Sequence, residues 1–229
     1  MVTVRIDALH QVYNDGNHNA FTDLCRFQGR YYLTFRSCPD GHMLFSSSRI
    51  VVLSSADGQT WSFVHAFQVP DRDVRDPHFL VFQNNLFIYS GTWLVYPGEP
   101  RRMNMNEHLG YCIQSADGVT WQAPQVCEGT HGYLTRYVGG PLLTKWGARY
   151  LVGGRKVVDR SKPTTVLYWL NDGELEEILE LPSGGDNSYP GFIELTPTQG
   201  LLSYYSSHEG SGTSLAPCHI YVAALTSEE

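Results

Sequence analysis

The sequence predicts an all-β fold, a small β-propeller of about four four-stranded blades, with five blades as the alternative. The first observation is a repeat: Ser-Ala-Asp-Gly-Gln-Thr-Trp at residues 55–61 recurs as Ser-Ala-Asp-Gly-Val-Thr-Trp at residues 115–121. The second is that strand-turn-strand pairs of another kind alternate with these repeats, which gives four strands in every 50 to 60 residues or so, the period of a propeller blade. The third is that the last module lacks an outer strand, which the first residues of the chain can supply.

The repeated Asp-Gly pairs predict tight hairpin turns. Asp-Gly between runs of alternating apolar residues is a strong hairpin indicator, because glycine adopts the positive φ that the turn requires. A degenerate third copy is found in Asn171-Asp172-Gly173. The predicted strands on either side of the three copies are residues 49–54 and 61–67, 109–114 and 121–127, and 166–170 and 175–181.

Four further hairpins precede or follow the Asp-Gly turns. A last predicted strand, residues 218–225, ends the chain, and residues 2–12 are expected to pair with it as the missing outer strand. Closing a ring with both chain ends removes an exposed sheet edge, so we expect one propeller domain over residues 1–229. The strand pairs of the four hairpins are residues 23–27 and 30–36, 78–82 and 86–91, 140–146 and 149–155, and 191–195 and 201–206.

The composition excludes several classes of protein. With 42% hydrophobic and 17% charged residues the chain is not disordered, and it has no apolar run long enough for a membrane span. A net charge of −7 argues against a nucleic-acid partner. The five cysteines show no metal-ligand spacing, and no phosphate loop is present, so we expect no metal and no cofactor. Reduced cysteines and the lack of a leader at the N-terminus favour a cytoplasmic protein, with a secreted protein that has lost its leader as the alternative.

Propeller topology sorts the polar residues by the end of the ring on which they lie. The hairpin turns point to one end, whereas the residues before each first strand and after each second strand lie at the other. Of the 16 basic residues 13 are arginines, and four of these map to the second end, at the mouth of the central channel: Arg36, Arg75, Arg136 and Arg155. Guanidinium groups bind carboxylates through paired hydrogen bonds, so this cluster suits an anionic ligand.

Arginines mixed with carboxylates suit the chemistry of an anionic sugar. Glycoside hydrolysis requires a pair of carboxyl groups, or a tyrosine activated by a carboxylate. The alternative is structural: Arg75, Asp76 and Arg36 form ion pairs that fill the channel. We interpret His18, His78 and His208 as hydrogen-bonding residues of the pocket and not as metal ligands.

The repeated Ser-Ala-Asp-Gly-x-Thr-Trp is similar to the Asp box, or BNR repeat, of the sialidase (neuraminidase) superfamily. Residues 18–24, Arg75-Asp76-Pro77, and residues 188–191 with 203–209 resemble a group of bacterial sialidase-like propellers that carry the label exo-α-sialidase. The chain departs from that family at Ala56 and Ala116, where the full box has aspartate, and in its four blades against six.

The resemblance implies roles for particular side chains. Three of the four arginines would bind the carboxylate of the substrate, with His78 and His208 nearby. Tyr189, Tyr204 or Tyr205 would be the nucleophile and Glu209 its base, with Asp23 or Asp76 as acid/base. Arg75-Asp76-Pro77 equally resembles the Arg-Asp-Pro of five-bladed furanosidase-type glycosidases, and under that resemblance the three carboxylates would be Asp23, Asp76 and Glu209.

Two classes of function therefore follow from the sequence. The first is a sialidase-like glycoside hydrolase that acts on an acidic or polar glycan without a cofactor, with the furanosidase type as a variant. The second is a non-catalytic propeller that binds glycans or takes part in an assembly, because fold does not imply function. The sequence leaves open whether the chain is an enzyme. Self-association through an exposed face of the ring is also left open.

Overall fold

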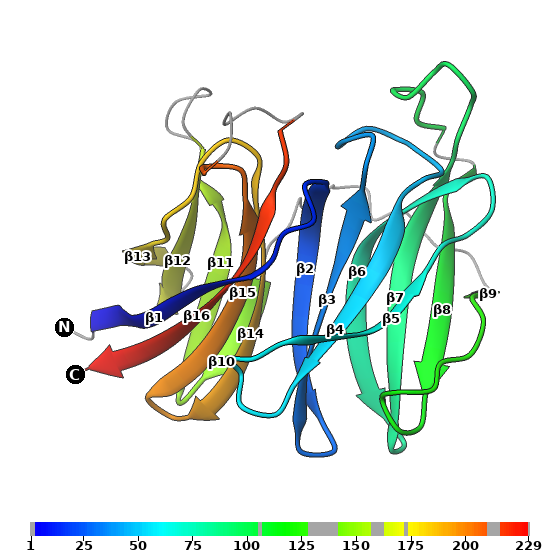
Figure 1. Cartoon of the computed structure of the whole chain (residues 1–229). Helices are drawn as coiled ribbons and strands as arrows, with labels where there is room; N and C mark the ends of the chain where they lie inside the picture. The colour runs from blue at the N-terminus through cyan, green and yellow to red at the C-terminus, as the bar shows by residue number, and fades with distance from the viewer. Residues whose placement is uncertain are drawn as a thin grey trace.

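The computed structural model describes residues 3–104, 107–127, 142–156, 163–171, 174–209 and 216–228, and these form four four-stranded antiparallel sheets (Figure 1). Each sheet is one blade of a propeller, so the prediction of an all-β ring with four blades is confirmed. No helix in the described ranges has the length and hydropathy that crossing a bilayer requires.

Each blade is assembled from strands that follow one another in the chain, except at the closure. Blade 1 consists of β2 (His18–Phe27), β3 (Arg30–Cys38), β4 (Arg49–Ser55) and β5 (Ser62–Phe67). Blade 2 consists of β6 (Arg72–Phe82), β7 (Asn85–Leu94), β8 (Leu109–Ser115) and β9 (Gln125–Val126). Blade 3 consists of β10 (Leu142–Trp146), β11 (Arg149–Lys156), β12 (Thr164–Asn171) and β13 (Glu174–Glu180). Blade 4 consists of β14 (Asn187–Thr196), β15 (Gln199–Ser206), β16 (His219–Glu228) and β1 (Thr3–Tyr13).

The two chain ends complete the same blade. Strand β1 pairs antiparallel with β16, from Thr3 opposite Glu228 to Tyr13 opposite Ile220, and Figure 1 shows the two strands side by side. The outer strand predicted from residues 2–12 is thus present almost as expected. The third Asp-Gly turn, at residues 172–173, lies outside the described residues.

The two complete Asp-Gly turns use the same hydrogen bonds. In the first, the Ser55 hydroxyl accepts the Gly58 amide at 2.8 Å, and the Asp57 carboxylate accepts the Thr60 amide at 2.8 Å. Ser115 and Asp117 make the equivalent bonds in the second turn, at 2.8 and 2.7 Å. Both glycines have positive φ, 75° and 74°, which explains why the repeat keeps this residue. The repeated motif therefore shapes turns and contributes no reacting group.

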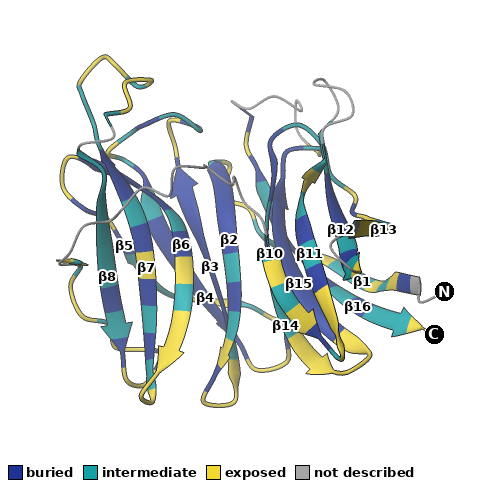
Figure 2. Ribbon diagram, turned by 180° about the vertical axis from the view of Figure 1, so that it is seen from behind, coloured by how far each residue is buried: buried dark blue, intermediate teal, exposed yellow. Residues whose placement is uncertain are grey.

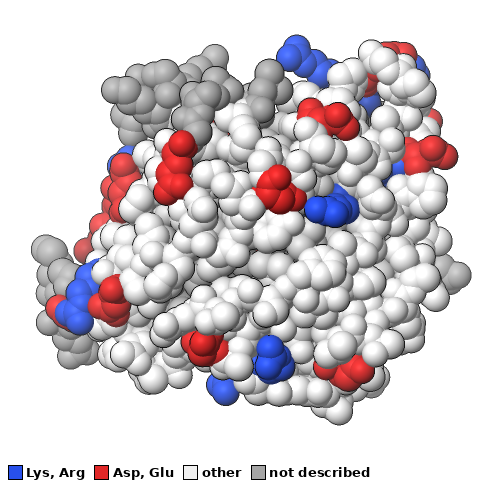
Figure 3. All heavy atoms as spheres, in the orientation of Figure 1, with Lys and Arg blue, Asp and Glu red and all other residues white. Residues whose placement is uncertain are grey.

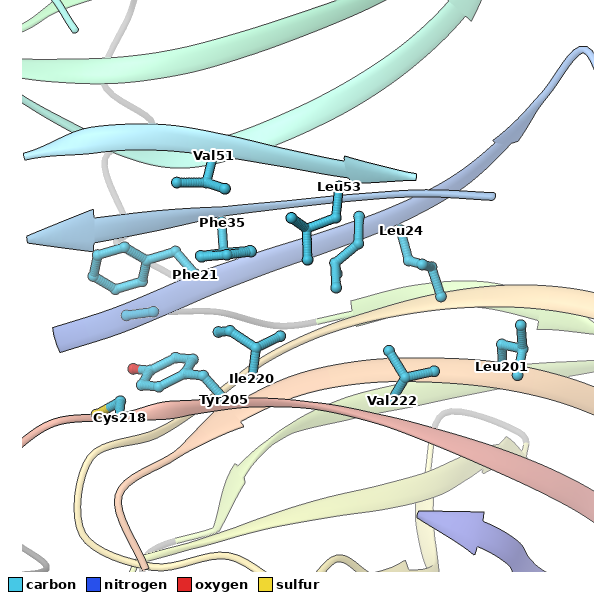
Figure 4. Packing of buried hydrophobic residues seen from close by; sticks show 12 residues of the cluster. Phe21, Leu24, Phe35, Val51, Leu53, Leu201, Tyr205, Cys218, Ile220 and Val222 are labelled. Atoms are coloured by element: carbon cyan, nitrogen blue, oxygen red, sulfur yellow. The ribbon is translucent and has the colours of Figure 1, made fainter. Parts of the chain in front are cut away.

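The core lies between neighbouring blades (Figure 2). One apolar cluster joins blades 1 and 4, where Phe35 and Val51 pack with Tyr205, Ile220 and Val222 (Figure 4). A second cluster joins blades 1 and 2, and a third joins blades 3 and 4. Each large apolar side chain so buried contributes about 1.5–3 kcal/mol, so packing between the blades fixes where their inner strands lie.

Charged side chains are spread thinly over the face shown in Figure 3. The described lysines, arginines, aspartates and glutamates on this face stand singly or in small mixed groups among uncharged residues. Nucleic-acid-binding domains instead carry basic patches or stripes, and none is visible on this face of the described chain.

Candidate functional site

Three inner strands carry a β-bulge at corresponding positions near the end of the ring drawn at the top in Figure 1. The bulges in β2, β6 and β14 give positive φ to Phe21 (61°), Asp76 (52°) and Tyr189 (52°). Such φ values are uncommon for residues other than glycine, and a bulge re-aims the side chain it carries. These three, which we call the bulge residues, bring one side chain from each of blades 1, 2 and 4 together.

The bulge residues contact one another. The rings of Phe21 and Tyr189 meet edge to face, with centroids 4.7 Å apart. Tyr205 adds a third ring, 5.9 Å from Phe21 and 6.2 Å from Tyr189. The Arg75 guanidinium lies 5.5 Å from the Phe21 ring centre, at cation–π distance. The structure thus assembles a small aromatic cluster where three blades meet, in which Phe21 and Tyr205 are buried and Tyr189 is partly exposed.

Asp76 is the carboxylate among the bulge residues. Burial raises its pKa, although the charges of Arg75 and His78 and a hydrogen bond with the Tyr189 side chain act in the opposite direction. The buried Oδ1 atom has no hydrogen-bond partner among the described residues. A partly buried carboxyl group with a raised pKa, next to a tyrosine hydroxyl, is the kind of group that accepts and returns a proton in general acid–base catalysis.

Two of the predicted arginines are held by one carboxylate, that of Asp73. Arg36 is fully buried; it donates to Asp73 Oδ2 at 2.5 Å and to the carbonyl oxygens of Gly41 and Met43 at 3.1 and 2.9 Å. Arg75 donates from Nε to Asp73 Oδ1 at 2.7 Å. Burial disfavours the charged form of Arg75, but the Asp73 carboxylate prevails and raises its pKa. Both guanidinium groups are therefore taken up by contacts inside the protein, with Asp73 and not Asp76 as the ion-pair partner.

A second polar cluster lies beside the aromatic cluster. Asp186, just before β14, accepts on Oδ2 from His18 Nε2 at 2.8 Å and lies 2.9 Å from His42 Nδ1. The two histidine nitrogens are 3.3 Å apart. Burial acts against ionisation of Asp186, but hydrogen bonds from both histidines hold its pKa well below the usual range. His18, His42 and Asp186 form the one described group of three side chains with metal-ligand atoms this close together.

Arg155 and Tyr205 hold the other oxygen of Asp186. The Tyr205 hydroxyl donates to Oδ1 at 2.9 Å, and Arg155 Nη2 donates to the same atom at 3.0 Å. Complete burial raises the pKa of Tyr205 well above its usual value, so this hydroxyl stays protonated. Arg155 keeps 36% of its side chain exposed, far more than Arg36 or Arg75.

Asp23 and His78 meet across blades 1 and 2. Asp23 Oδ2 accepts the backbone amide of Phe79 at 2.7 Å and lies 3.7 Å from His78 Nδ1. The nearby Asp23 carboxylate raises the pKa of His78, and burial opposes this shift. Most of the His78 side chain is exposed, so the imidazole is accessible from the same end of the ring.

The remaining predicted residues lie away from the bulges. Glu209 contacts Gln11 of β1 at 2.8 Å and His219 of β16 at 3.1 Å, both on outer strands of blade 4. His208 lies 2.8 Å from the Ser206 hydroxyl. Tyr204 donates to the carbonyl of Pro182. Arg136 lies outside the described residues.

Three side chains of this region were missed by sequence reasoning as functional candidates: Asp73, His42 and Asp186. Asp73 stands two residues before Arg75, and residues i and i+2 of a strand share a face, so this pairing was available from the sequence. His42 lies in the loop between β3 and β4, where no periodicity places a side chain. Asp186 comes from blade 4, and only the ring closure brings it to His18.

Comparison with known proteins adds information on the fold. No family model matches the chain, and no curated protein does. A protein of unknown function from Dyadobacter fermentans superposes with a TM-score of 0.66 at 16% identity, over 97% of this chain and 99% of that one. The GH43_1 enzyme from Xanthomonas citri complexed with xylose gives 0.57 at 12% identity, over 94% and 89% of the two chains.

A further solved structure is the GH43 β-xylosidase/α-arabinofuranosidase CoXyl43 from a compost metagenome. It gives a TM-score of 0.58 at 12% identity and covers 98% of this chain and 96% of its own. Likeness at such low identity shows the fold alone. The chain therefore has a four-bladed β-propeller fold similar to that of propeller glycoside hydrolases.

Proposed function

We propose that the chain is a glycoside hydrolase whose reacting groups lie at the bulge residues, with Tyr189 and Asp76 as the central pair. The observation that carries this proposal is the contact between a tyrosine hydroxyl and a carboxylate whose pKa is raised by burial. Some glycosidases use a tyrosine nucleophile activated by a carboxylate, and this pair has the required composition. Asp76 thus takes the role of base that the resemblance to sialidases implied for Glu209.

The residues present supply every proton transfer of a two-step reaction. In the first step the Tyr189 oxygen bonds to the anomeric carbon while its proton passes to Asp76. The glycosidic bond breaks, and His78, whose pKa Asp23 raises, gives a proton to the leaving oxygen. In the second step water attacks the anomeric carbon and loses its proton to His78, while Asp76 returns a proton to the departing Tyr189.

The arginines favour a particular kind of substrate. Recognition of a sugar carboxylate by three arginines cannot use Arg36 or Arg75 without breaking their bonds to Asp73. Arg155 is also bonded, to Asp186 and to the Asn187 carbonyl oxygen, but its side chain is 36% exposed, so it is the described member of the predicted set that a ligand can reach. We therefore propose a polar glycan, held by aromatic and hydrogen-bonding contacts with at most one or two guanidinium groups. Pentose substrates are included because the Xanthomonas enzyme was crystallised with xylose and xylotriose.

A screen of fluorogenic glycosides tests this function. The full chain is assayed on a sialoside, a β-xyloside and an α-arabinofuranoside. Asp76→Asn and Tyr189→Phe should each lower kcat/KM by about 100-fold or more on the accepted substrate, the usual scale for loss of an acid/base group. His10→Gln, an exposed histidine of β1, serves as the matched control and should keep full activity. Activity that survives both site variants refutes the assigned roles.

The second candidate is a glycan-binding propeller without catalysis. It is favoured by the fact that Asp76 is the one carboxylate among the three bulge residues, because retaining and inverting hydrolases normally use two. Under this proposal the wild type hydrolyses none of the glycosides but binds xylotriose or sialyllactose in calorimetry, and Tyr189→Ala weakens that binding. If the chain neither hydrolyses these glycosides nor binds these glycans, both candidates are wrong.

A further inference from the structure

We propose that His18, His42 and Asp186 bind a divalent transition-metal ion of the zinc type, at a site separate from the Asp76–Tyr189 pair. The three facing atoms are His18 Nε2, His42 Nδ1 and Asp186 Oδ2, at separations of 2.8, 2.9 and 3.3 Å. Ligands about 2.0–2.1 Å from a tetrahedral zinc ion lie about 3.3–3.4 Å from one another. Shifts of about half an ångström would therefore let all three atoms bind one ion.

Hydrogen bonding alone leaves one close contact in this group unfavourable. If both histidine nitrogens donate to Asp186 Oδ2, two N–H groups converge on one oxygen with their nitrogens only 3.3 Å apart. If one of the nitrogens is unprotonated, its lone pair faces the carboxylate oxygen instead. One of the three contacts is thus unfavourable in either arrangement. A cation between the atoms satisfies three lone pairs at once.

The surroundings of Asp186 hold its carboxylate in a ligating orientation. Tyr205 and Arg155 both donate to Oδ1, which leaves Oδ2 directed at the two histidines. The Ser207 hydroxyl and the Asp186 backbone amide are also hydrogen-bonded, at 2.9 Å, so the residue is fixed from several sides. Hydrogen bonds to a ligand from outside the coordination sphere orient it and raise metal affinity.

The donor set selects the kind of metal. Two imidazole nitrogens and one carboxylate oxygen suit zinc, cobalt or nickel, whereas calcium and magnesium prefer six or more oxygen ligands. His18 and Asp186 are 1% and 5% exposed, and His42 is 24% exposed, so an ion enters past His42 and the loop that carries it. Three protein ligands leave a fourth position for water or a bound molecule.

Three arginines lie close to this site, and one of them, Arg75, donates to the His42 carbonyl oxygen at 3.0 Å while its charge is compensated by Asp73. Arg155 contacts Asp186 directly, and Arg36 acts on His18 through its charge. The charge of Arg36 is compensated by Asp73, to which it is bonded. Arg155 therefore remains as the main positive charge that opposes binding of a cation. Replacing Arg155 would remove this repulsion but would also remove a bond that orients the Asp186 carboxylate, so the two effects on affinity would cancel in part. Tyr205 is the cleaner position for testing the outer contact.

Calorimetry and cobalt spectroscopy on the chelator-stripped full chain test the proposal. Wild type should bind one equivalent of Zn²⁺, and Co²⁺ should produce the intense visible absorption of a four-coordinate site. His42→Gln should weaken Zn²⁺ binding by about 100-fold or more, and Tyr205→Phe by about 10-fold. His10→Gln, again the exposed control, should bind as the wild type does. Because His42 lies in a loop, its substitution should disturb folding less than substitution of His18 or Asp186. Circular dichroism verifies that each variant is folded.

Several outcomes would overturn the site. One is the absence of saturable Zn²⁺ and Co²⁺ binding by wild type. Another is equal binding by wild type and His42→Gln, which would place the ion elsewhere. Tighter binding of Ca²⁺ than of Zn²⁺ would contradict the assigned chemistry. None of these results depends on hydrolysis, so the metal site and the proposed glycosidase activity are tested independently.

Discussion

Arg36 and Asp73 form an ion pair in which neither side chain is exposed to solvent, with Nη2 and Oδ2 2.5 Å apart. The pair joins β3 of blade 1 to β6 of blade 2. Because Arg36 also binds the carbonyl oxygens of Gly41 and Met43, it fixes the loop that carries His42. An arginine that the sequence suggested for substrate recognition thus serves to position other parts of the site.

Removing Asp73 should destabilise the protein strongly. Asp73→Ala leaves Arg36 and Arg75 buried without their anion, and breaking a buried pair in this way costs about 3–5 kcal/mol. Urea denaturation measures the free energy of unfolding. The control is Glu99→Gln, which removes the partner of exposed Arg102 and should change stability by no more than about 1 kcal/mol. Equal effects of the two variants would contradict the structural role.

The two Asp-Gly turns should respond unequally to alanine. Both glycines have φ near 75°, a conformation that costs an L-residue about 1–2 kcal/mol. A Cβ atom at Gly118 would stand 2.0 Å from the Tyr32 hydroxyl oxygen, whereas at Gly58 the nearest atom is a Leu201 methyl at 2.9 Å. Gly118→Ala should therefore lower the free energy of unfolding by at least about 1 kcal/mol more than Gly58→Ala. Equal losses in thermal or urea unfolding would contradict the contact with Tyr32.

His78 should titrate above the ordinary histidine value of 6.5, because Asp23 stabilises its charged form. A folded-state pKa above the unfolded one means that the contribution to stability is complete below about pH 6.5 and is lost as the pH rises through the folded pKa. NMR titration of the His78 ring protons measures the value. Asp23→Asn should lower the pKa of His78. A titration midpoint that is the same in wild type and Asp23→Asn would exclude Asp23 as the cause.

Substitution of the two tyrosines of the aromatic cluster should have different effects on stability and on kcat. Tyr205 is buried and donates to Asp186, so Tyr205→Phe should cost about 1.5–3 kcal/mol of stability, the scale for a hydrogen bond to a charged group. Its kcat should fall far less than the roughly 100-fold loss expected for Tyr189→Phe. Parallel assays on the accepted glycoside, at a temperature where both variants are folded, make the comparison. The reverse order of effects would make Tyr205 the nucleophile.

Local sequence patterns determined the blades and their closure. The alternation of apolar residues, the repeated Asp-Gly turns and the unpaired strands at the two termini each depend on neighbours in the chain, and they predicted the order and pairing of the strands. The bounds differ in places: β2, β6 and β14 begin earlier than predicted, at His18, Arg72 and Asn187, and the strand predicted over residues 121–127 is limited to Gln125–Val126. The expectation that Arg75 and Asp76 lie near the axis came from the same topology. Such features depend on backbone pairing, which has a fixed period.

The contacts between side chains of different blades could not be predicted from local patterns. The bulges at Phe21, Asp76 and Tyr189 turn side chains out of the regular alternation, so no period of two predicts their directions. Ring closure brings Asp186 to His18, 168 residues away in sequence, whereas Glu209 contacts Gln11 and His219 on the outer strands of blade 4. Local patterns therefore predicted the four-bladed ring, which the structure confirms. Packing between blades then brings Arg36 of β3 to Asp73 of β6, and Asp76 of β6 to Tyr189 of β14, because these contacts join strands from different blades.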